Sequence, residues 1–165
     1  SKALKINTSI QKLYLNENEI GKNETDMKYL SEALIANNSL KDLDLNWNEI
    51  GKNKSDLFYL SQGLKKNKNL QNLYLFNNII GNNKEDLIYV KSALEENRTL
   101  KELDLSWNCI GDNSNDFEQL AEGLKANITL MILNLAKNKI DCNENIQAFK
   151  NNNPGVILVS FFADL

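Results

Sequence analysis

The sequence predicts an α/β fold: a right-handed curved solenoid, or horseshoe, with a parallel sheet on its concave face and helices on its convex face. Three observations predict it. The chain repeats itself every thirty residues, and each repeat contains a short stretch in which apolar and polar residues alternate. Each repeat then continues into an apolar stripe with helical spacing. We expect a single domain over residues 1–165, made of about five repeats.

Columns of identical residue types carry the thirty-residue period. The clearest columns are Leu13, Leu43, Leu73, Leu103 and Leu133; Leu15, Leu45, Leu75, Leu105 and Leu135; Asn18, Asn48, Asn78, Asn108 and Asn138; and Ile20, Ile50, Ile80, Ile110 and Ile140. One repeat of this length cannot bury its own leucines. Neighbouring repeats must therefore stack and share one core.

Alternation predicts the strand of each repeat. Around Leu43 and Leu45, the apolar residues alternate with Asp42, Asp44 and Asn46, which is the period-two pattern of a strand with one buried face. The leucines are expected to point into the core. The residues between them are expected to point to the concave face.

The segment after each strand contains an asparagine and then a single glycine. We expect the asparagine side chain to turn inward and to hydrogen-bond backbone groups of adjacent repeats. The glycines occur once per repeat, which is typical of turn residues with positive φ and not of a phosphate-binding loop. These glycines are Gly21, Gly51, Gly81 and Gly111.

The helix of each repeat is predicted by apolar residues at i, i+3 and i+7, as at Leu57, Leu60 and Leu64. We expect Asn53 to cap this helix and Asp56 to reach back in a capping-box arrangement. A column of small residues is expected to let each helix approach its neighbour, and a column of tyrosines to pack between helices on the convex side. The columns are Ala33, Gly63, Ala93 and Gly123, and Tyr29, Tyr59 and Tyr89.

The pattern L-x-x-L-x-L-x-x-N, as at residues 40–48, resembles the leucine-rich repeat superfamily. Repeats of nearly thirty residues with a true helix are similar to the ribonuclease-inhibitor-like class, which also occurs in NOD-like receptors and Ran GTPase-activating proteins. The resemblance covers essentially the whole chain. It implies the fold and is unspecific for function. The repeats depart from that class by one or two extra residues between the glycine and the helix.

The N-terminal end is predicted to begin within a repeat. Ala3, Leu4 and Asn7 match residues 33, 34 and 37, so the chain starts near the end of a repeat's helix. We expect upstream repeats or another domain to precede it.

The C-terminal end is predicted to be a cap over residues 153–165. Val159 and Phe161 are matched with Leu133 and Leu135, and a shortened final helix is expected at about residues 143–151. The stretch 156–162 is predicted as a sixth strand, with Phe162 and Leu165 covering its edge. The alternative is that this strand pairs with another chain.

The predicted partner-binding surface consists of aromatic and acidic residues that alternate with the core leucines or follow them. These residues are Tyr14, Asp42, Asp44, Trp47, Tyr74, Phe76, Glu102, Asp104 and Trp107. Large exposed aromatic side chains are unusual unless a partner covers them, and the carboxylates favour a partner with basic groups. The alternative for Trp47 and Trp107 is a packing role at the corner between strand and loop.

Several other functions are disfavoured by composition. Because the chain has no histidine, catalytic triads and histidine metal sites are excluded. A net charge of −3 and a single arginine, Arg98, disfavour nucleic-acid binding. No apolar stretch is long enough to cross a membrane. Cys109 and Cys142 are interpreted as loop thiols, and the carboxylate pairs Asp42–Asp44 and Glu102–Asp104 as a solvated face and not as an acid–base pair.

The expected function is therefore protein binding through the concave face, as part of a larger protein, without catalysis, cofactor or metal. We expect a monomer in the cytoplasm, or in a host cytosol if the protein is a secreted effector. The resemblance offers one alternative, a GTPase-activating regulator of the Ran type. Arg98 is expected in the turn between helix and strand, where an arginine finger is poorly placed.

Overall fold

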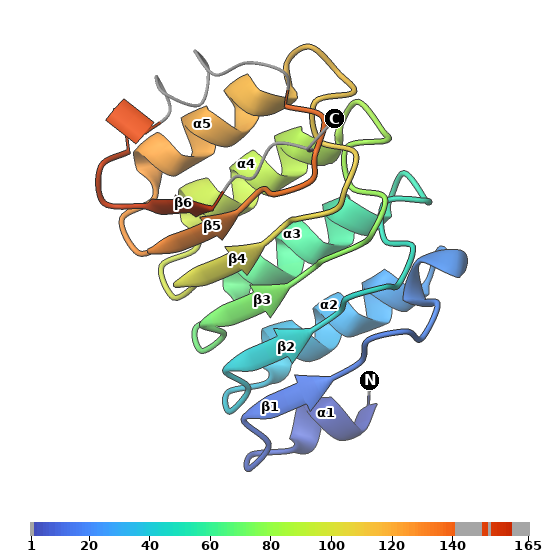
Figure 1. Cartoon of the computed structure of the whole chain (residues 1–165). Coiled ribbons are helices and arrows are strands. Elements are labelled where there is room, and N and C mark those ends of the chain that lie inside the picture. The colour runs from blue at the N-terminus through green and yellow to red at the C-terminus, as the bar shows by residue number, and fades with distance from the viewer. Residues whose placement is uncertain (1, 141–149, 152, 160–165) are drawn as a thin grey trace.

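The computed structural model describes residues 2–140, 150–151 and 153–159. Within these ranges, strands and helices alternate along the chain, and all the strands form one sheet in the order β1-β2-β3-β4-β5-β6 (Figure 1). The strands are β1 (Lys12–Tyr14), β2 (Asp42–Asp44), β3 (Asn72–Tyr74), β4 (Glu102–Asp104), β5 (Ile132–Asn134) and β6 (Ile157–Val159). The helices are α1 (Lys2–Ile6), α2 (Asp26–Ala36), α3 (Asp56–Lys66), α4 (Asp86–Glu96) and α5 (Asp116–Ala126), with a short 3₁₀ helix η1 (Ile20–Lys22).

The sheet is parallel and in register at the predicted period. Leu13 lies beside Leu43, Leu43 beside Leu73, and the same pairing continues to Leu133. All the helices lie on one side of the sheet (Figure 1). The sheet face turned away from them is the concave face named below, and the predicted α/β repeat architecture is confirmed.

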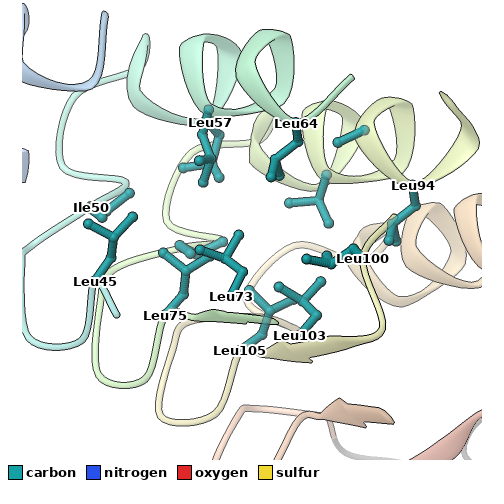
Figure 2. Close-up of a cluster of buried hydrophobic side chains, with 14 of the residues drawn as sticks. Leu45, Ile50, Leu57, Leu64, Leu73, Leu75, Leu94, Leu100, Leu103 and Leu105 are labelled. Carbon is teal, nitrogen blue, oxygen red and sulfur yellow. The ribbon is translucent and has the colours of Figure 1, made fainter. Parts of the chain in front are cut away.

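Strand and helix leucines form one continuous core between the sheet and the helices. Leu73 and Leu75 of repeat three meet Leu103 and Leu105 of repeat four, beneath the α3 and α4 leucines (Figure 2). Leu43 and several of its counterparts are fully buried. Fully burying one leucine stabilises a fold by about 1.5–3 kcal/mol, so the leucine columns hold the repeats together.

The asparagine column forms a ladder of hydrogen bonds between repeats, as predicted. Asn48 Nδ2 donates to the Leu15 carbonyl at 2.8 Å, while Asn48 Oδ1 accepts from the Asn18 and Ile20 N–H groups at 3.0 and 3.2 Å. Asn78 repeats these contacts one turn further along. The side chain therefore satisfies backbone groups that the strand leaves unpaired.

The helix start differs in part from the prediction. Asp56 Oδ2 accepts from the Gly51 and Asn53 N–H groups at 3.1 and 3.2 Å, so the back-reaching carboxylate is confirmed. The prediction that the Asn53 side chain caps α3 is wrong. Asn53 Nδ2 instead donates to the Gly21 carbonyl at 2.5 Å, because the stacked preceding repeat brings that carbonyl within reach.

Glycine is required in these turns for two reasons: a positive φ and the close approach of the next repeat. Gly51, Gly81 and Gly111 have φ of 98°, 97° and 103°, which confirms the predicted positive φ at these turns. Gly21 differs, because it lies in η1 without positive φ. A Cβ at Gly21 would stand 2.2 Å from the Glu49 carbonyl oxygen, so the approach of the next repeat excludes a side chain there.

The sixth strand is confirmed, but its alignment with β5 differs from the predicted one. Leu158, not Val159, pairs with Leu133, and Val159 pairs with Asn134. The connection from the buried Asn153 to the strand is one residue shorter than in the preceding repeat, which shifts the register by one. Phe161, Phe162, Leu165, Cys142 and the segment 143–149 of the predicted final helix lie outside the described residues. None of the described helices is long and apolar enough to span a membrane.

Candidate protein-binding surface

The strand register sorts the predicted site residues into rows across the concave face. One row runs from Tyr14 through Asp44 and Tyr74 to Asp104. The parallel row below it contains Lys12, Asp42, Asn72 and Glu102. Aromatic and acidic residues thus alternate from strand to strand, because the sequence motif alternates between successive repeats.

Trp47, Phe76 and Trp107 form what we call the aromatic ladder. The Phe76 ring lies edge-on to both tryptophans, at centroid distances of 5.7 Å to Trp47 and 6.2 Å to Trp107, with interplanar angles of 67° in each case. Trp47 and Trp107 are still 53% and 52% exposed. Each tryptophan therefore contacts Phe76 and still leaves about half of its residue surface open to solvent.

The two tryptophans occupy an unusual backbone conformation. Trp47 and Trp107 have φ of 58° and 54°, in the left-handed region that bulky side chains rarely adopt. Asn77 holds the equivalent position of the intervening repeat with φ 51°. Asparagine tolerates this conformation far better than tryptophan does. Tryptophan is therefore a poor choice for this turn on backbone grounds alone.

Backbone hydrogen bonds position the ladder. The Phe76 N–H donates to Asn46 Oδ1 at 2.7 Å, and the Trp47 N–H donates to the Phe76 carbonyl at 3.0 Å. The Asn46 N–H in turn donates to Asp44 Oδ1 at 2.9 Å. Residues on two adjacent repeats thus fix the backbone from which the rings project.

The carboxylates of the concave face are held by neighbouring polar groups. Asp42 accepts from Asn72 Nδ2 at 2.6 Å and pairs with Lys12 Nζ at 3.0 Å. Asp104 Oδ1 accepts from the Ser106 N–H at 2.8 Å, and Asp104 Oδ2 accepts from Asn134 Nδ2 at 3.0 Å. These contacts fix the carboxylates in place. Among the ion pairs of the described residues, one involves a carboxylate of this face, that of Asp42 with Lys12.

Tyr74 lies on β3, between the two strands that carry the acidic residues, β2 and β4. Its hydroxyl donates to Glu102 Oε2 at 3.4 Å. Burial first, and then the negative charges of Glu102, Asp42 and Asp104, raise the pKa of Tyr74 above its ordinary value. The centre of the concave face therefore carries a negative potential.

The structure brings the predicted site residues together on one face of the sheet. Tyr14 lies at its edge, exposed on β1 and beside Asp44 of β2, and it has no ring contact with the aromatic ladder among the described residues. The sequence did not indicate a hollow of about 560 Å³ beside Trp47, lined also by Glu17, Glu19 and Glu49. The sequence does carry one signal of the turn beside this hollow. Asn77, a residue type common in left-handed turns, occupies the position that Trp47 and Trp107 hold in the neighbouring repeats.

The tyrosines of the convex side and the thiol of Cys109 lie outside the concave face. Phe58 of α3 lies edge-on to Tyr89 of α4 at 5.6 Å, so Tyr89 packs between these helices as predicted. Tyr59 lies edge-on to Phe58 of its own helix at 5.3 Å, and Tyr29 is half exposed. Cys109 is a partly buried free thiol whose pKa is raised, first of all by burial. Among the described residues, no cluster of acidic and cysteine side chains could hold a metal ion.

Comparison with known proteins agrees with this geometry. The family described as Leucine Rich repeat matches residues 36–53 and 96–114. The tropomodulin C-terminal domain of Caenorhabditis elegans is similar over 93% of this chain and 88% of that chain, with a TM-score of 0.71 and 12% identity. A structure titled Leiomodin-1 Actin-Binding Site 2 is similar over 93% and 84%, with a TM-score of 0.74 and 20% identity. No curated protein sequence matches the chain.

Proposed function

We propose that this chain, which has the leucine-rich repeat fold, is a protein-interaction module that binds its partner through the concave face. The aromatic ladder is the observation that carries the proposal. Tryptophan and tyrosine dominate binding energy at protein interfaces, and the two tryptophans of the ladder are half exposed at a left-handed turn, outside the core. The sequence matches cover only parts of the chain, so the proposal depends on this geometry.

The backbone contacts of the ladder favour binding. Side chains already fixed in place lose little conformational entropy when a partner docks. Because parallel strands and the asparagine ladder hold the turns of adjacent repeats, Trp47, Phe76 and Trp107 present one preorganised surface. We expect the partner to dock as a rigid body, without reordering of the sheet.

The decisive experiment replaces both tryptophans by the residue that the chain itself uses at that turn. The variant Trp47→Asn/Trp107→Asn copies Asn77, so its free energy of unfolding should stay the same or rise. Partner affinity should fall by about thirtyfold or more for each tryptophan lost. Affinity is measured by titration against a captured partner, and folding by circular dichroism.

The matched control is Ile88→Gln on α4, which removes an exposed apolar side chain from the convex side. It should leave affinity unchanged. Retained affinity in the folded tryptophan variant would refute concave-face binding.

Actin is the first partner to test, because one structure with this fold is titled an actin-binding site. Co-sedimentation with filamentous actin, compared between the wild type and the tryptophan variant, is the direct assay. A cytoplasmic location belongs to the same proposal. If neither variant sediments with actin, the partner lies elsewhere and capture from lysate is the next step.

The GTPase-activating alternative gains no support from the site. Arg98 is exposed in the turn between α4 and β4, where Nη1 donates to the Asn97 carbonyl at 2.9 Å. That turn lies outside the rows of the concave face. A GTP hydrolysis assay with candidate GTPases would detect such an activity, and we expect no stimulation.

A further inference from the structure

The concave face carries two pairs of carboxylates on alternate strands, with an uncharged aromatic strand between them. The pairs are Asp42 with Asp44 on β2 and Glu102 with Asp104 on β4. Because β3 separates β2 from β4 in the sheet and adjacent strands lie about 4.8 Å apart, the two pairs stand about 10 Å apart. This spacing is the geometric basis of the inference.

Most of these carboxylates form no ion pair with a Lys or Arg side chain in the described part of the chain. None of the ion pairs there includes Asp44, Glu102 or Asp104. Lys41 and Lys101 stand exposed just before β2 and β4 and form no ion pair with them. Burial is the larger cause of the raised pKa of Tyr74, and the negative charges of Glu102, Asp42 and Asp104 raise it further. A bound partner would therefore gain by supplying positive charge.

We propose that the concave face binds a helical protein segment that presents two Lys or Arg side chains about 10 Å apart, with an apolar side chain between them. This inference rests on the proposed function and specifies the chemistry of the partner. In a helix, residues i and i+7 share one face and lie about 10.5 Å apart. In an extended segment, residues of one face lie about 7 or 13 Å apart, and neither spacing matches the acidic pairs.

The residues between the acidic pairs suit an apolar side chain in the middle of such a helix. Tyr74 and Phe76 of repeat three lie between the two acidic strands, and the tryptophans of the aromatic ladder flank Phe76. An apolar side chain at i+3 or i+4 would cover Tyr74 and Phe76. The aliphatic stems of the basic residues would pack against the indole rings, where cations are also attracted.

The test uses designed helical peptides as probes. The first peptide carries Lys at i and i+7 and Leu at i+3 and i+4. The second has Glu in place of Lys, and the third moves one Lys from i+7 to i+5, which places it on another face. The chain contains two tryptophans, Trp47 and Trp107, and both belong to the surface in question. Intrinsic tryptophan fluorescence therefore reports binding directly.

The charge variant is Asp44→Asn/Glu102→Gln/Asp104→Asn, in which each new amide keeps one acceptor oxygen while the charge is removed. At Asp104 the substitution keeps the acceptor for the Ser106 N–H and loses the one for Asn134 Nδ2. The control, Glu24→Gln/Glu85→Gln/Glu118→Gln, makes the same change in net charge at exposed glutamates that form no described ion pair. We expect saturable binding of the first peptide to the wild type and the control. Affinity should be about tenfold or more weaker for the charge variant, for the other two peptides and in about 0.5 M salt.

Three results with the peptides and the protein alone would overturn the inference, and a fourth concerns the natural partner. The first is that the Lys and Glu peptides bind equally well. The second is that the Lys peptide gives no saturable fluorescence change up to about 1 mM. The third is that the protein forms a concentration-dependent dimer and that the tryptophan variant does not. The dimer would mean that a second copy covers this face. If the tryptophan variant loses its natural partner while the charge variant keeps it at wild-type affinity, the proposed function holds and this inference fails.

Discussion

Asp86 shows how a single buried carboxylate makes the stability of this fold depend on pH. It is fully buried, its Oδ2 accepts from the Gly81 and Asn83 N–H groups at 3.0 and 3.2 Å, and its Oδ1 has no hydrogen-bond partner. Burial raises the pKa of Asp86 to about 6, against an ordinary value of about 3.9. The folded protein therefore holds this proton between about pH 4 and pH 6, where the unfolded chain has lost it.

The consequence is a loss of stability as the pH rises through that window. Each pH unit should remove about 1.4 kcal/mol or less from the free energy of unfolding, and the loss should level off above about pH 6. The variant Asp86→Asn lacks this proton. Its stability relative to the wild type should therefore rise by about 1 kcal/mol between pH 5 and pH 7 in urea unfolding. Glu85→Gln, at an exposed neighbour, is the control, and parallel pH curves for Asp86→Asn and the wild type would contradict the prediction.

The buried asparagines give a second prediction at the residue scale. Asn78→Ala would leave the Asn48 and Ile50 N–H groups and the Leu45 carbonyl without partners. Unsatisfied buried polar groups cost about 1–3 kcal/mol each, so we expect a loss of at least about 2 kcal/mol in the free energy of unfolding. Asn18 is the matched control, since it is exposed and its side chain donates to the Asn16 carbonyl in its own repeat. If Asn18→Ala and Asn78→Ala lose equal stability, the ladder is not what supports the turns.

At the scale of elements, the small residues on the helices decide how closely neighbouring helices approach. A Cβ at Gly123 would stand 2.9 Å from the Lys91 Cα, which is backbone and cannot move aside. A Cβ at Gly63 would first meet Ser31 Oγ at 3.1 Å, which belongs to a rotatable side chain, and its nearest backbone atom, Ser31 Cα, is at 3.3 Å. The packing of α5 on α4 is therefore tighter at this column than the packing of α3 on α2.

The two glycines should respond differently to alanine. Gly63→Ala gains about 1 kcal/mol of helix propensity against a small adjustment of Ser31, so its stability should be unchanged or raised. Gly123→Ala should destabilise the fold by about 1–3 kcal/mol, because the strain exceeds the propensity gain. Thermal unfolding of both variants is the measurement. A similar shift of the midpoint in both would show that the neighbouring helices relax equally.

For the whole molecule, stacking predicts a gradient of local stability along the chain. Each repeat contacts only its neighbours, so central repeats are supported from two sides. In α1 no residue is buried, and β1 has no fully buried residue, whereas Leu43 and Leu73 at the centres of β2 and β3 are fully buried. We expect amide hydrogen exchange to be slowest in β2 to β4 and fastest in α1 and β1. Uniform protection from α1 to α5 would show instead that the repeats open as one unit.

The thirty-residue period determined the architecture before any coordinates. Alternation around Leu43 and Leu45 identified the strands, the stripe of Leu57, Leu60 and Leu64 identified a helix, and the asparagine column predicted the inward ladder. These predictions succeeded because burial of a periodic apolar face has one solution, in which repeats stack in register. The family resemblance was read from the same columns.

Tertiary structure alone decided the contacts between repeats and the geometry of the site. No local pattern shows that Asn53 reaches the Gly21 carbonyl, or that one residue is missing before β6, because both depend on how one repeat lies against the next. The edge contacts of Trp47 and Trp107 with Phe76 are likewise set by the left-handed turn after each strand. The sequence by itself determined which leucines face the core, since their burial follows periodicity. Which exposed side chains meet depends on the stacking distance and on turn angles, and those exist only in the assembled fold.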